Sequence, residues 1–409
     1  MTTNIDASKG LAQPSHASQK QPASWSAVFA MSVCAFALIA SEFLPVSLLT
    51  PMASDLRVTE GMTGQGIAIS GAFAVLTSLF ISTLAGNLNR KTLLLGLTAA
   101  MGVSGAIVDM APNYLIYMFG RALIGVVVGG FWSMSAATAI RLVPVPDVPR
   151  ALAIVNGGNA LATVVAAPLG AYLGAVIGWR GAFFCLVPVS LIALAWQWKT
   201  LPSMPAVARA SGICNALKVF TLLARPGVAL GMLASSLLFM GQFALFTYLR
   251  PFLETVTGVH GTTISLILLV IGAAGFVGTV LIGRVLQRGF YQTLIIIPLL
   301  MAAAALVLIA FGSSVAVVTL LLALWGLAGT SAPVGWWAWI AKVFPQDAEA
   351  GGGLFVAVVQ MSIAIGSTVG GLLFDLSGYQ STFVLSAVLL AICSFLTFMT
   401  SRAAAAQAT

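Results

Sequence analysis

Ala40-Ser41-Glu42-Phe43-Leu44-Pro45-Val46-Ser47-Leu48-Leu49-Thr50-Pro51 is the stretch that decides the fold, because it places a carboxylate and a proline inside a long apolar run. The run extends from Trp25 to Leu49, which is long enough for a helix that crosses a bilayer. A carboxylate near the bilayer centre costs roughly 2.5–3.5 kcal/mol on insertion scales, so Glu42 needs a reason to be there. Pro45 has no N–H for the Ser41 carbonyl, so that acceptor needs water, a solute or another helix.

The composition of the whole chain is that of a polytopic membrane protein. Of its 409 residues, 60% are hydrophobic and 7% are charged, whereas charged residues make up about a quarter of an ordinary soluble chain. The formal net charge is +8, but the basic residues lie in short clusters between apolar runs rather than in one patch. This distribution serves membrane topology and does not predict a nucleic-acid partner.

The sequence predicts no metal site, no cofactor and no enzymatic activity. The cysteines and histidines stand apart, without CxxC or Cys/His spacing, and are interpreted as single packing or surface residues. The sequence also lacks the HExxH, GxSxG and phosphate-loop motifs. The residues concerned are Cys34, Cys185, Cys214, Cys393, His16 and His260.

The apolar runs predict twelve transmembrane helices. We expect the first six at 25–50, 62–86, 92–110, 114–142, 151–177 and 181–199, and the second six at 226–250, 261–283, 290–311, 315–341, 351–374 and 379–400. The polar residues 1–24 predict a disordered tail, and 401–409 a second tail. Residues 201–224 predict a linker between two six-helix bundles, at 25–200 and 225–400.

The basic residues predict the orientation of the chain in the membrane. With the N-terminus inside, the outer loops carry only Arg57, Arg180 and Arg250. All other lysines and arginines except Arg121, which falls within a span, lie in the tails, the inner loops or the linker. The positive-inside rule therefore places both termini in the cytoplasm.

The two halves of the sequence resemble each other at an offset of 200 residues. Val143 and Asp147 recur as Val343 and Asp347, and Gly170, Gly178 and Phe183 recur as Gly370, Gly378 and Phe383. Two parallel repeats of six helices are the architecture of alternating-access transporters. We therefore expect an all-α membrane protein whose twelve helices form two pseudo-symmetric bundles.

Depth along the helices suggests a partner for Glu42. Glu42 and Arg121 each lie about seven residues, or roughly 10 Å, from the expected outer end of a span. Intramembrane charges usually face a cavity and find a partner. We expect Glu42 to lie beside Arg121 and to bind the coupling proton, since movement of either helix would change its proton affinity. The alternative is that both side chains only reach toward the outer headgroups.

Polar and aromatic side chains at membrane depth predict the solute site. Flat rings and neutral amides suit a planar, polar, uncharged solute that can stack and form directional hydrogen bonds. For Trp336 an interfacial aromatic belt near Lys342 is the alternative. The residues expected to bind solute are Trp132, Asn156, Asn159, Gln242, Phe246, Tyr248, Trp336 and Gln360.

Small residues and prolines predict helix packing and gating. Gly125 and Gly129 lie four apart on one helical face, a spacing that permits close helix contact, and Pro168 predicts a bend. Packing alone explains most of these residues. Those expected to act in gating or packing are Pro45, Gly125, Pro168, Arg90 and Lys91.

Several short motifs carry a family resemblance. They include Glu42-Phe-Leu-Pro-Val-Ser-Leu-Leu-Thr-Pro-Met-Ala53, Gly129-Gly-Phe-Trp132, Ala166-Ala-Pro-Leu-Gly170, Gly241-Gln-Phe-Ala244 and Pro333-Val-Gly-Trp336. In them the chain resembles the major facilitator superfamily, and within it the drug/proton antiporter branch that contains bacterial purine ribonucleoside efflux pumps. The resemblance implies that Arg121 with Gly125 is the arginine motif implicated in proton coupling, and that Pro168 belongs to a motif associated with antiport. The loop Gly86-Asn-Leu-Asn-Arg90-Lys91 is shorter than the family's and lacks its usual aspartate.

Residues and resemblance together predict proton-driven efflux of small neutral polar solutes across a bacterial inner membrane. Purine ribonucleosides such as inosine and guanosine are the favoured solutes, and efflux of sugars, base analogues or drugs is the alternative. The expected partners are membrane lipid, the solute and protons, and the expected state is a monomer. A membrane enzyme or a sensor that does not transport is the rival from a different class.

Overall fold

The computed structural model describes residues 24–85, 88–205, 226–343 and 348–406, and the regular structure in these ranges is helical. The predicted tail 1–23, Cys214 with most of the linker, Asp347 and residues 407–409 lie outside the described ranges. The first half contains α1 (Trp25–Leu56), α2 (Glu60–Ala85), α3 (Arg90–Asp109), α4 (Tyr114–Leu142), η1 (Val145–Asp147), α5 (Val148–Phe184) and α6 (Leu186–Thr200). The second half contains α8 (Pro226–Phe246), α9 (Leu249–Thr255), α10 (Thr262–Arg288), α11 (Phe290–Phe311), α12 (Val315–Val343) and α13 (Ala348–Ala406).

The described helices account for twelve membrane spans. Ten stretches are long and apolar enough to cross a bilayer, and two of them, Arg150–Thr200 and Leu354–Ala404, contain 51 residues each. At 1.5 Å per residue such a stretch is about 76 Å long, more than twice the hydrocarbon core of about 30 Å. Each long stretch divides at a glycine into two spans, so the chain is an all-α membrane protein with twelve transmembrane helices.

The two dividing glycines build the same turn in both halves. Gly178 has φ 77° and ψ 165°, and Gly378 has φ 78° and ψ 179°, a left-handed backbone that glycine adopts most readily. After each glycine an aromatic pair packs edge to face: Trp179 on Phe183 at 6.3 Å and Tyr379 on Phe383 at 5.6 Å. The repeat at an offset of 200 residues is therefore a repeat of structure.

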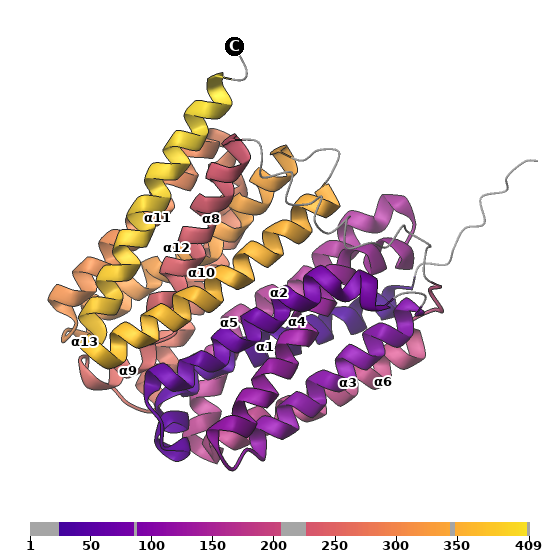
Figure 1. Cartoon of the computed structure of the whole chain (residues 1–409), viewed down its shortest axis with the longest axis horizontal. Helices are drawn as coiled ribbons and strands as arrows, with labels where there is room; N and C mark the ends of the chain where they lie inside the picture. The colour runs from indigo at the N-terminus through magenta and orange to yellow at the C-terminus, as the bar shows by residue number, and fades with distance from the viewer. Residues whose placement is uncertain (1–23, 86–87, 206–225, 344–347, 407–409) are drawn as a thin grey trace, which may run out of the picture.

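The helices form two bundles that meet at one end of the molecule (Figure 1). In the first bundle α1 packs on α5 and α2 on α4, and in the second α8 packs on α13 and α10 on α12. The bundles contact each other through α2 with α13, α5 with α10, and α1 with α9. Figure 1 shows them converging near α9 and spreading apart toward the C-terminus. We call the end that carries α9, the α1–α2 turn and Gly378 the closed end.

Glycines let α4 lie directly on the backbone of α2. A Cβ on Gly125 would lie 2.2 Å from the Ser70 carbonyl oxygen, and a Cβ on Gly129 would lie 2.2 Å from that of Ala74. Real Cβ atoms do not approach this closely, so only glycine allows the contact at the present helix distance. The predicted close packing at Gly125 and Gly129 is confirmed.

Candidate functional site

Glu42 lies inside α1 and contacts the second bundle. Its Oε1 accepts a hydrogen bond of 3.2 Å from Nε2 of Gln360 on α13, so this bond joins the two halves. Glu42 is half-buried and Gln360 is buried. Because α1 continues to Leu56, Glu42 lies about 21 Å from the end of the helix, farther than expected for a helix that ends near residue 50.

Arg121 lies beside Glu42 and is almost fully buried, with 1% of its surface exposed. Its Nη1 donates to the Ser41 carbonyl at 2.9 Å, and its Nε donates to the Gly66 carbonyl at 3.1 Å. Its Nη2 has no hydrogen-bond partner among the described residues. The guanidinium therefore contacts the residue next to Glu42 without an ion pair to the carboxylate, and it ties α4 to both α1 and α2.

The Ser41 carbonyl is the acceptor that Pro45 frees. Pro45 is buried within α1, and the donor that the missing N–H would have supplied comes instead from Arg121. Of the three kinds of partner expected for this carbonyl, the structure supplies another helix. The proline and the arginine thus act on one backbone atom, adjacent to the carboxylate.

Three phenylalanines cross the interface next to Glu42. The ring of Phe43 on α1 lies 6.3 Å from that of Phe243 and 6.1 Å from that of Phe246, and the two α8 rings are 6.2 Å apart. These distances and tilted arrangements are typical of attractive aromatic pairs. Phe246 is 8% exposed, so in this structure it packs against α1 rather than against open space.

Tyr248 is buried at the closed end, in the break between α8 and α9. Its hydroxyl donates to the Ser367 carbonyl at 2.7 Å, and its ring stacks on Phe374 at 5.3 Å. Added Cβ atoms on Gly64 and on Gly371 would each lie 2.2 Å from the Tyr248 hydroxyl oxygen. The structure therefore places Tyr248 between the two bundles.

Gln242 and Trp336 lie within the second bundle. The Gln242 amide nitrogen would be 3.0 Å from a Cβ on Gly329 of α12, and its Oε1 is buried without a hydrogen-bond partner among the described residues. Trp336 is 1% exposed and packs edge to face on Trp339, with ring centroids 5.5 Å apart. Neither indole forms an interfacial belt here, whereas Trp337 is 45% exposed.

Three further solute candidates lie in the first bundle, on α4 and α5. Trp132 is half-buried and packs edge to face on Phe131 at 5.6 Å. Asn156 is exposed and its amide donates to the Leu152 carbonyl at 2.9 Å, while Asn159 is half-buried. The described hydrogen bonds do not link these three side chains to the candidates in the second bundle.

The remaining gating candidates make contacts inside the first bundle. Arg90 Nη1 lies 3.5 Å from the sulfur of Met134, and Lys91 Nζ donates to the Trp198 carbonyl at 2.8 Å. Pro168 is buried in α5, and a Cβ on nearby Gly170 would lie 2.5 Å from Leu44 of α1. Gly86 and Asn87 of the loop before Arg90 lie outside the described residues.

The closed end is held by polar contacts that the sequence did not predict. Asp375 accepts hydrogen bonds from the Thr59 hydroxyl at 2.5 Å and from the Gly61 N–H at 3.0 Å, so it caps the start of α2 from the other bundle. Arg250 of α9 donates to the Ser47 carbonyl of α1. The sequence places Arg250 in an outer loop, and nothing in its local sequence reveals a partner in the other half.

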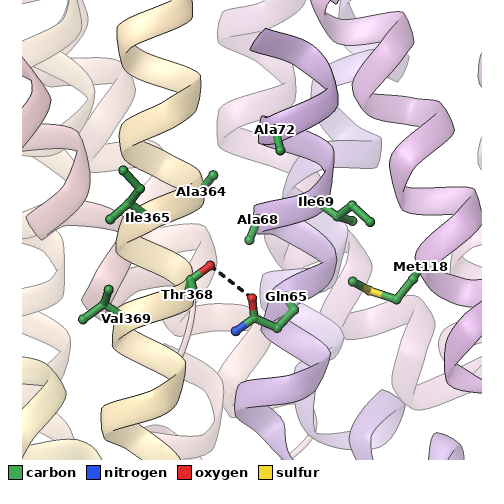
Figure 2. Close-up of a pocket in the computed structure, with 9 residues that line it drawn as sticks. All are labelled: Gln65, Ala68, Ile69, Ala72, Met118, Ala364, Ile365, Thr368 and Val369. Atoms are coloured by element: carbon green, nitrogen blue, oxygen red, sulfur yellow. Dashed lines mark hydrogen bonds between the residues drawn. The ribbon is translucent and has the colours of Figure 1, made fainter. Parts of the chain in front are cut away.

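A cavity of about 370 Å³ lies on the seam between α2 and α13 (Figure 2). Its lining is largely apolar, and its polar pair is Thr368 Oγ1 donating to Gln65 Oε1 at 3.1 Å. None of the solute candidates lines it, and Ile365 and Val369 are 39% and 37% exposed at its edge. It is therefore a groove beside the interface, distinct from the expected solute site.

Comparisons of the sequence and of the fold with known proteins point to the same family. The sequence model of the Major Facilitator Superfamily matches residues 31–352. The "Transcription regulatory protein OpdE" of Pseudomonas aeruginosa is 76% identical over 386 residues, which cover 94% of this chain and 96% of that protein. The "Purine ribonucleoside efflux pump NepI" of Salmonella enteritidis is 40% identical over 366 residues, which cover 90% and 91%.

Among solved structures, a bacterial homolog of the human lysosomal transporter Spinster, inward-facing and unoccupied, has a TM-score of 0.74 at 14% identity. The match covers 93% of this chain and 98% of that one, and at such identity it concerns the fold alone. Twelve helices in two repeated bundles, the matched sequence model and the relatives agree: the chain belongs to the Major Facilitator Superfamily.

Proposed function

We propose that the chain is a proton-coupled exporter of small neutral polar solutes, with purine ribonucleosides such as inosine and guanosine as the first candidates. The named activity of NepI, at 40% identity over nine-tenths of this chain, supports this solute class. The proposal includes a monomer in the inner membrane of a bacterium, with both termini in the cytoplasm. Efflux of sugars, base analogues or drugs is the alternative within the same mechanism.

The hydrogen bond between Gln360 and Glu42 is the observation that carries the proton-coupling proposal. A hydrogen bond to an ionised acceptor is roughly twice as strong as a neutral one, so protonation of Glu42 weakens the bond to Gln360. Because Glu42 belongs to the first bundle and Gln360 to the second, proton binding changes how firmly the bundles hold together. Arg121 keeps α1 in place through the Ser41 carbonyl.

The proposed orientation makes the closed end the outer end. The structure then corresponds to a carrier that is shut toward the outside, with Glu42 ionised and bonded to Gln360. Protonation from outside and solute binding from inside favour opposite openings of the two bundles. A ligand moves such an equilibrium only by its difference in affinity for the two states, and the Glu42 contact provides that difference for the proton.

The proposed solute path runs between the bundles near Glu42. The amides of Asn156, which is exposed, and Asn159, which is half-buried, and the buried, unpartnered Oε1 of Gln242 offer hydrogen bonds. The Phe246 ring packs on Phe43 of α1 in this structure and would offer a stacking face when the bundles separate. These groups suit a heteroaromatic base that carries hydrogen-bonding edges. Trp336 and Tyr248 are buried in this structure, so each side chain would have to become exposed before it could contact solute.

Transport in everted membrane vesicles tests the proposal. With a proton gradient imposed, vesicles that contain the protein should accumulate radiolabelled inosine and guanosine, and a protonophore should abolish the accumulation. Vesicles with the Glu42→Gln variant should respond to the gradient at least several-fold less than the parent. A sugar and a cationic drug serve as competing solutes. If no nucleoside moves under the gradient, the nucleoside proposal fails; if Glu42→Gln responds like the parent, the proton role of Glu42 fails.

The name of the OpdE relative favours a second candidate, an effect on transcription. A transporter can change gene expression without contacting nucleic acid, by setting the internal concentration of a solute that a regulator senses. Transcript profiles of cells without the gene, with the gene, and with the Glu42→Gln variant separate the two cases. Transcript changes that depend on Glu42 would support the indirect route, and changes that persist with the variant would support direct regulation.

A further inference from the structure

Each proline inside α1 frees one backbone carbonyl of that helix. Pro45 cannot bond the Ser41 carbonyl, and Pro51 cannot bond the Ser47 carbonyl, because proline has no N–H. Ser41 is 4% exposed and Ser47 is fully buried. A buried carbonyl without a partner is costly, so each of the two needs a donor from another part of the chain.

An arginine supplies the donor in both cases, but from different bundles. Nη1 of Arg121, on α4 of the first bundle, donates to Ser41, and Nη1 of Arg250, on α9 of the second bundle, donates to Ser47. The first bond joins two helices of one bundle, which pack together as a unit. The second bond joins the two bundles at the closed end. The same chemical device therefore serves once as a fixed support and once as a contact that domain movement must break.

Arg250 is held in position for this contact. Its Nε donates to Glu254 Oε1 at 2.8 Å, one turn further along α9, and the two side chains are 13% and 14% exposed. A guanidinium can bond a carboxylate and a carbonyl at the same time because its N–H groups are arranged in a rigid fork. The ion pair uses Nε and orients the guanidinium so that Nη1 points toward α1 and stays available for the Ser47 carbonyl.

We propose that the Ser47 carbonyl, freed by Pro51, and the Arg250 guanidinium form a latch that keeps the closed end shut and releases when that end opens. The inference rests on the proposed transport function, because a latch matters only in a protein that alternates between two openings. On opening, water replaces each partner, so the net free-energy change of breaking the bond is small compared with its strength in isolation. A contact of this kind closes the end and still permits reopening.

Spin-label distances across the closed end test the latch. Labels at Ser54 on α1 and Leu376 on α13, both exposed, are placed in a background without the native cysteines and measured in lipid nanodiscs. Arg250→Gln should raise the ratio of long to short distances about tenfold, as expected for loss of one charge-assisted hydrogen bond. Pro51→Ala should shift it in the same direction, because the new N–H would bond the Ser47 carbonyl within the helix.

Arg57→Gln is the matched control. Arg57 is exposed at the same end, so the variant makes the same charge change without touching the Ser47 contact, and its distances should equal those of the parent. The double variant Pro51→Ala/Arg250→Gln should open the end no further than the stronger single variant, because both remove one bond. Melting temperatures of all variants separate opening from unfolding.

Three results would overturn the latch. Arg250→Gln could match Arg57→Gln, Pro51→Ala could leave the distances of the parent unchanged, or the two effects could add. The distance measurements require neither solute nor a proton gradient, so they test the latch independently of inosine export. Intact export with an unaltered closed end in Arg250→Gln would remove the latch and leave the transport proposal in place.

Discussion

The helix α1 and its repeat, α8 with α9, start from the same position in their bundles and differ in three respects. At an offset of 200 residues, Glu42 of α1 corresponds to Gln242, an amide of nearly the same shape. The acid bonds the other bundle through Gln360, whereas the amide packs against Gly329 inside its own bundle. In addition α1 is one helix of 32 residues, whereas its repeat is interrupted between Phe246 and Leu249.

The arginine of α4 likewise has no charged counterpart in the second bundle. The position 200 residues after Arg121 is Leu321, which has no charge. The first bundle therefore holds both ionisable groups of the candidate proton site, and the second holds the buried indoles of Trp325, Trp336 and Trp339. The comparison teaches that the backbone was repeated while both ionisable groups of the proposed proton site were kept in one bundle.

Glu42→Gln converts the first bundle to the residue of the second and should have the largest effect. Loss of the coupling between proton and solute should reduce gradient-driven inosine exchange roughly 5- to 150-fold, the range of typical coupling free energies. The dependence of transport on pH should flatten, since no titrating group remains at this position. Exchange measured in vesicles over a range of pH checks both. As a matched control, Gln242→Glu in the same background should not restore the pH dependence, and restoration would mean that the two bundles are interchangeable.

Arg121→Leu likewise replaces a residue of the first bundle by its counterpart in the second, and it should lower the stability of the protein. The buried Ser41 carbonyl would lose its donor, so the free energy of unfolding should fall by about 1–3 kcal/mol. Arg121→Lys should fall between leucine and the parent, because a point charge cannot bond the Ser41 and Gly66 carbonyls as the fork does. Thermal unfolding in detergent, monitored as the loss of monodisperse protein with temperature, measures the difference in stability between the parent and each variant. A leucine variant as stable as the parent would refute the role of Arg121 as a support for α1.

Gly125→Ala and Gly326→Ala test a feature that the two bundles share, the close contact of two helices at a glycine. A Cβ on Gly125 would lie 2.2 Å from the Ser70 carbonyl oxygen, and one on Gly326 would lie 2.2 Å from that of Ile271. Both alanines should destabilise the protein by about 1–3 kcal/mol through overpacking, and by similar amounts. Gly96→Ala, where a Cβ would meet nothing within 4 Å, is the control and should have little effect. Unequal melting temperatures for the first two would show that the repeat does not extend to packing.

Asp375→Asn should have the smallest effect. Asparagine retains an acceptor for the Gly61 N–H, but it loses the negative charge near the start of α2, which is worth about 0.3–1 kcal/mol. The ratio of open to closed distances between labels at Ser54 and Leu376 should rise by less than in Arg250→Gln. An equal or larger rise would place the main closing contact at Asp375.

The sequence was sufficient for the fold because the bilayer sets the length of an apolar helix. The spans and the repeat follow from local pattern and from one offset, and the structure confirms them. That the repeated Gly178 and Gly378 form turns is seen only in the structure. The need of the Ser41 carbonyl for a partner also followed from Pro45 alone. These features depend on chemistry within one or two turns of helix, which a single sequence displays directly.

The contacts between bundles could not be predicted in the same way. Arg250 with Ser47, and Asp375 with Gly61, join residues that are far apart in sequence, and their pairing depends on how two rigid units are placed. The burial of Tyr248 and Trp336 depends on the same placement and on packing inside the second bundle. The extension of α1 to Leu56 was missed because a helix continues past the hydrocarbon region wherever its backbone bonds remain satisfied.

The groove on the seam of α2 and α13 has a consequence for the membrane that surrounds the protein. Its apolar walls come from both bundles, so its width must change when the bundles tilt against each other. In the proposed alternation between two openings, acyl chains of the neighbouring lipid would be the apolar material available to fill the groove, and a chain held there would resist its narrowing. The speed of alternation should therefore depend on the length and unsaturation of the lipids in which the protein is reconstituted.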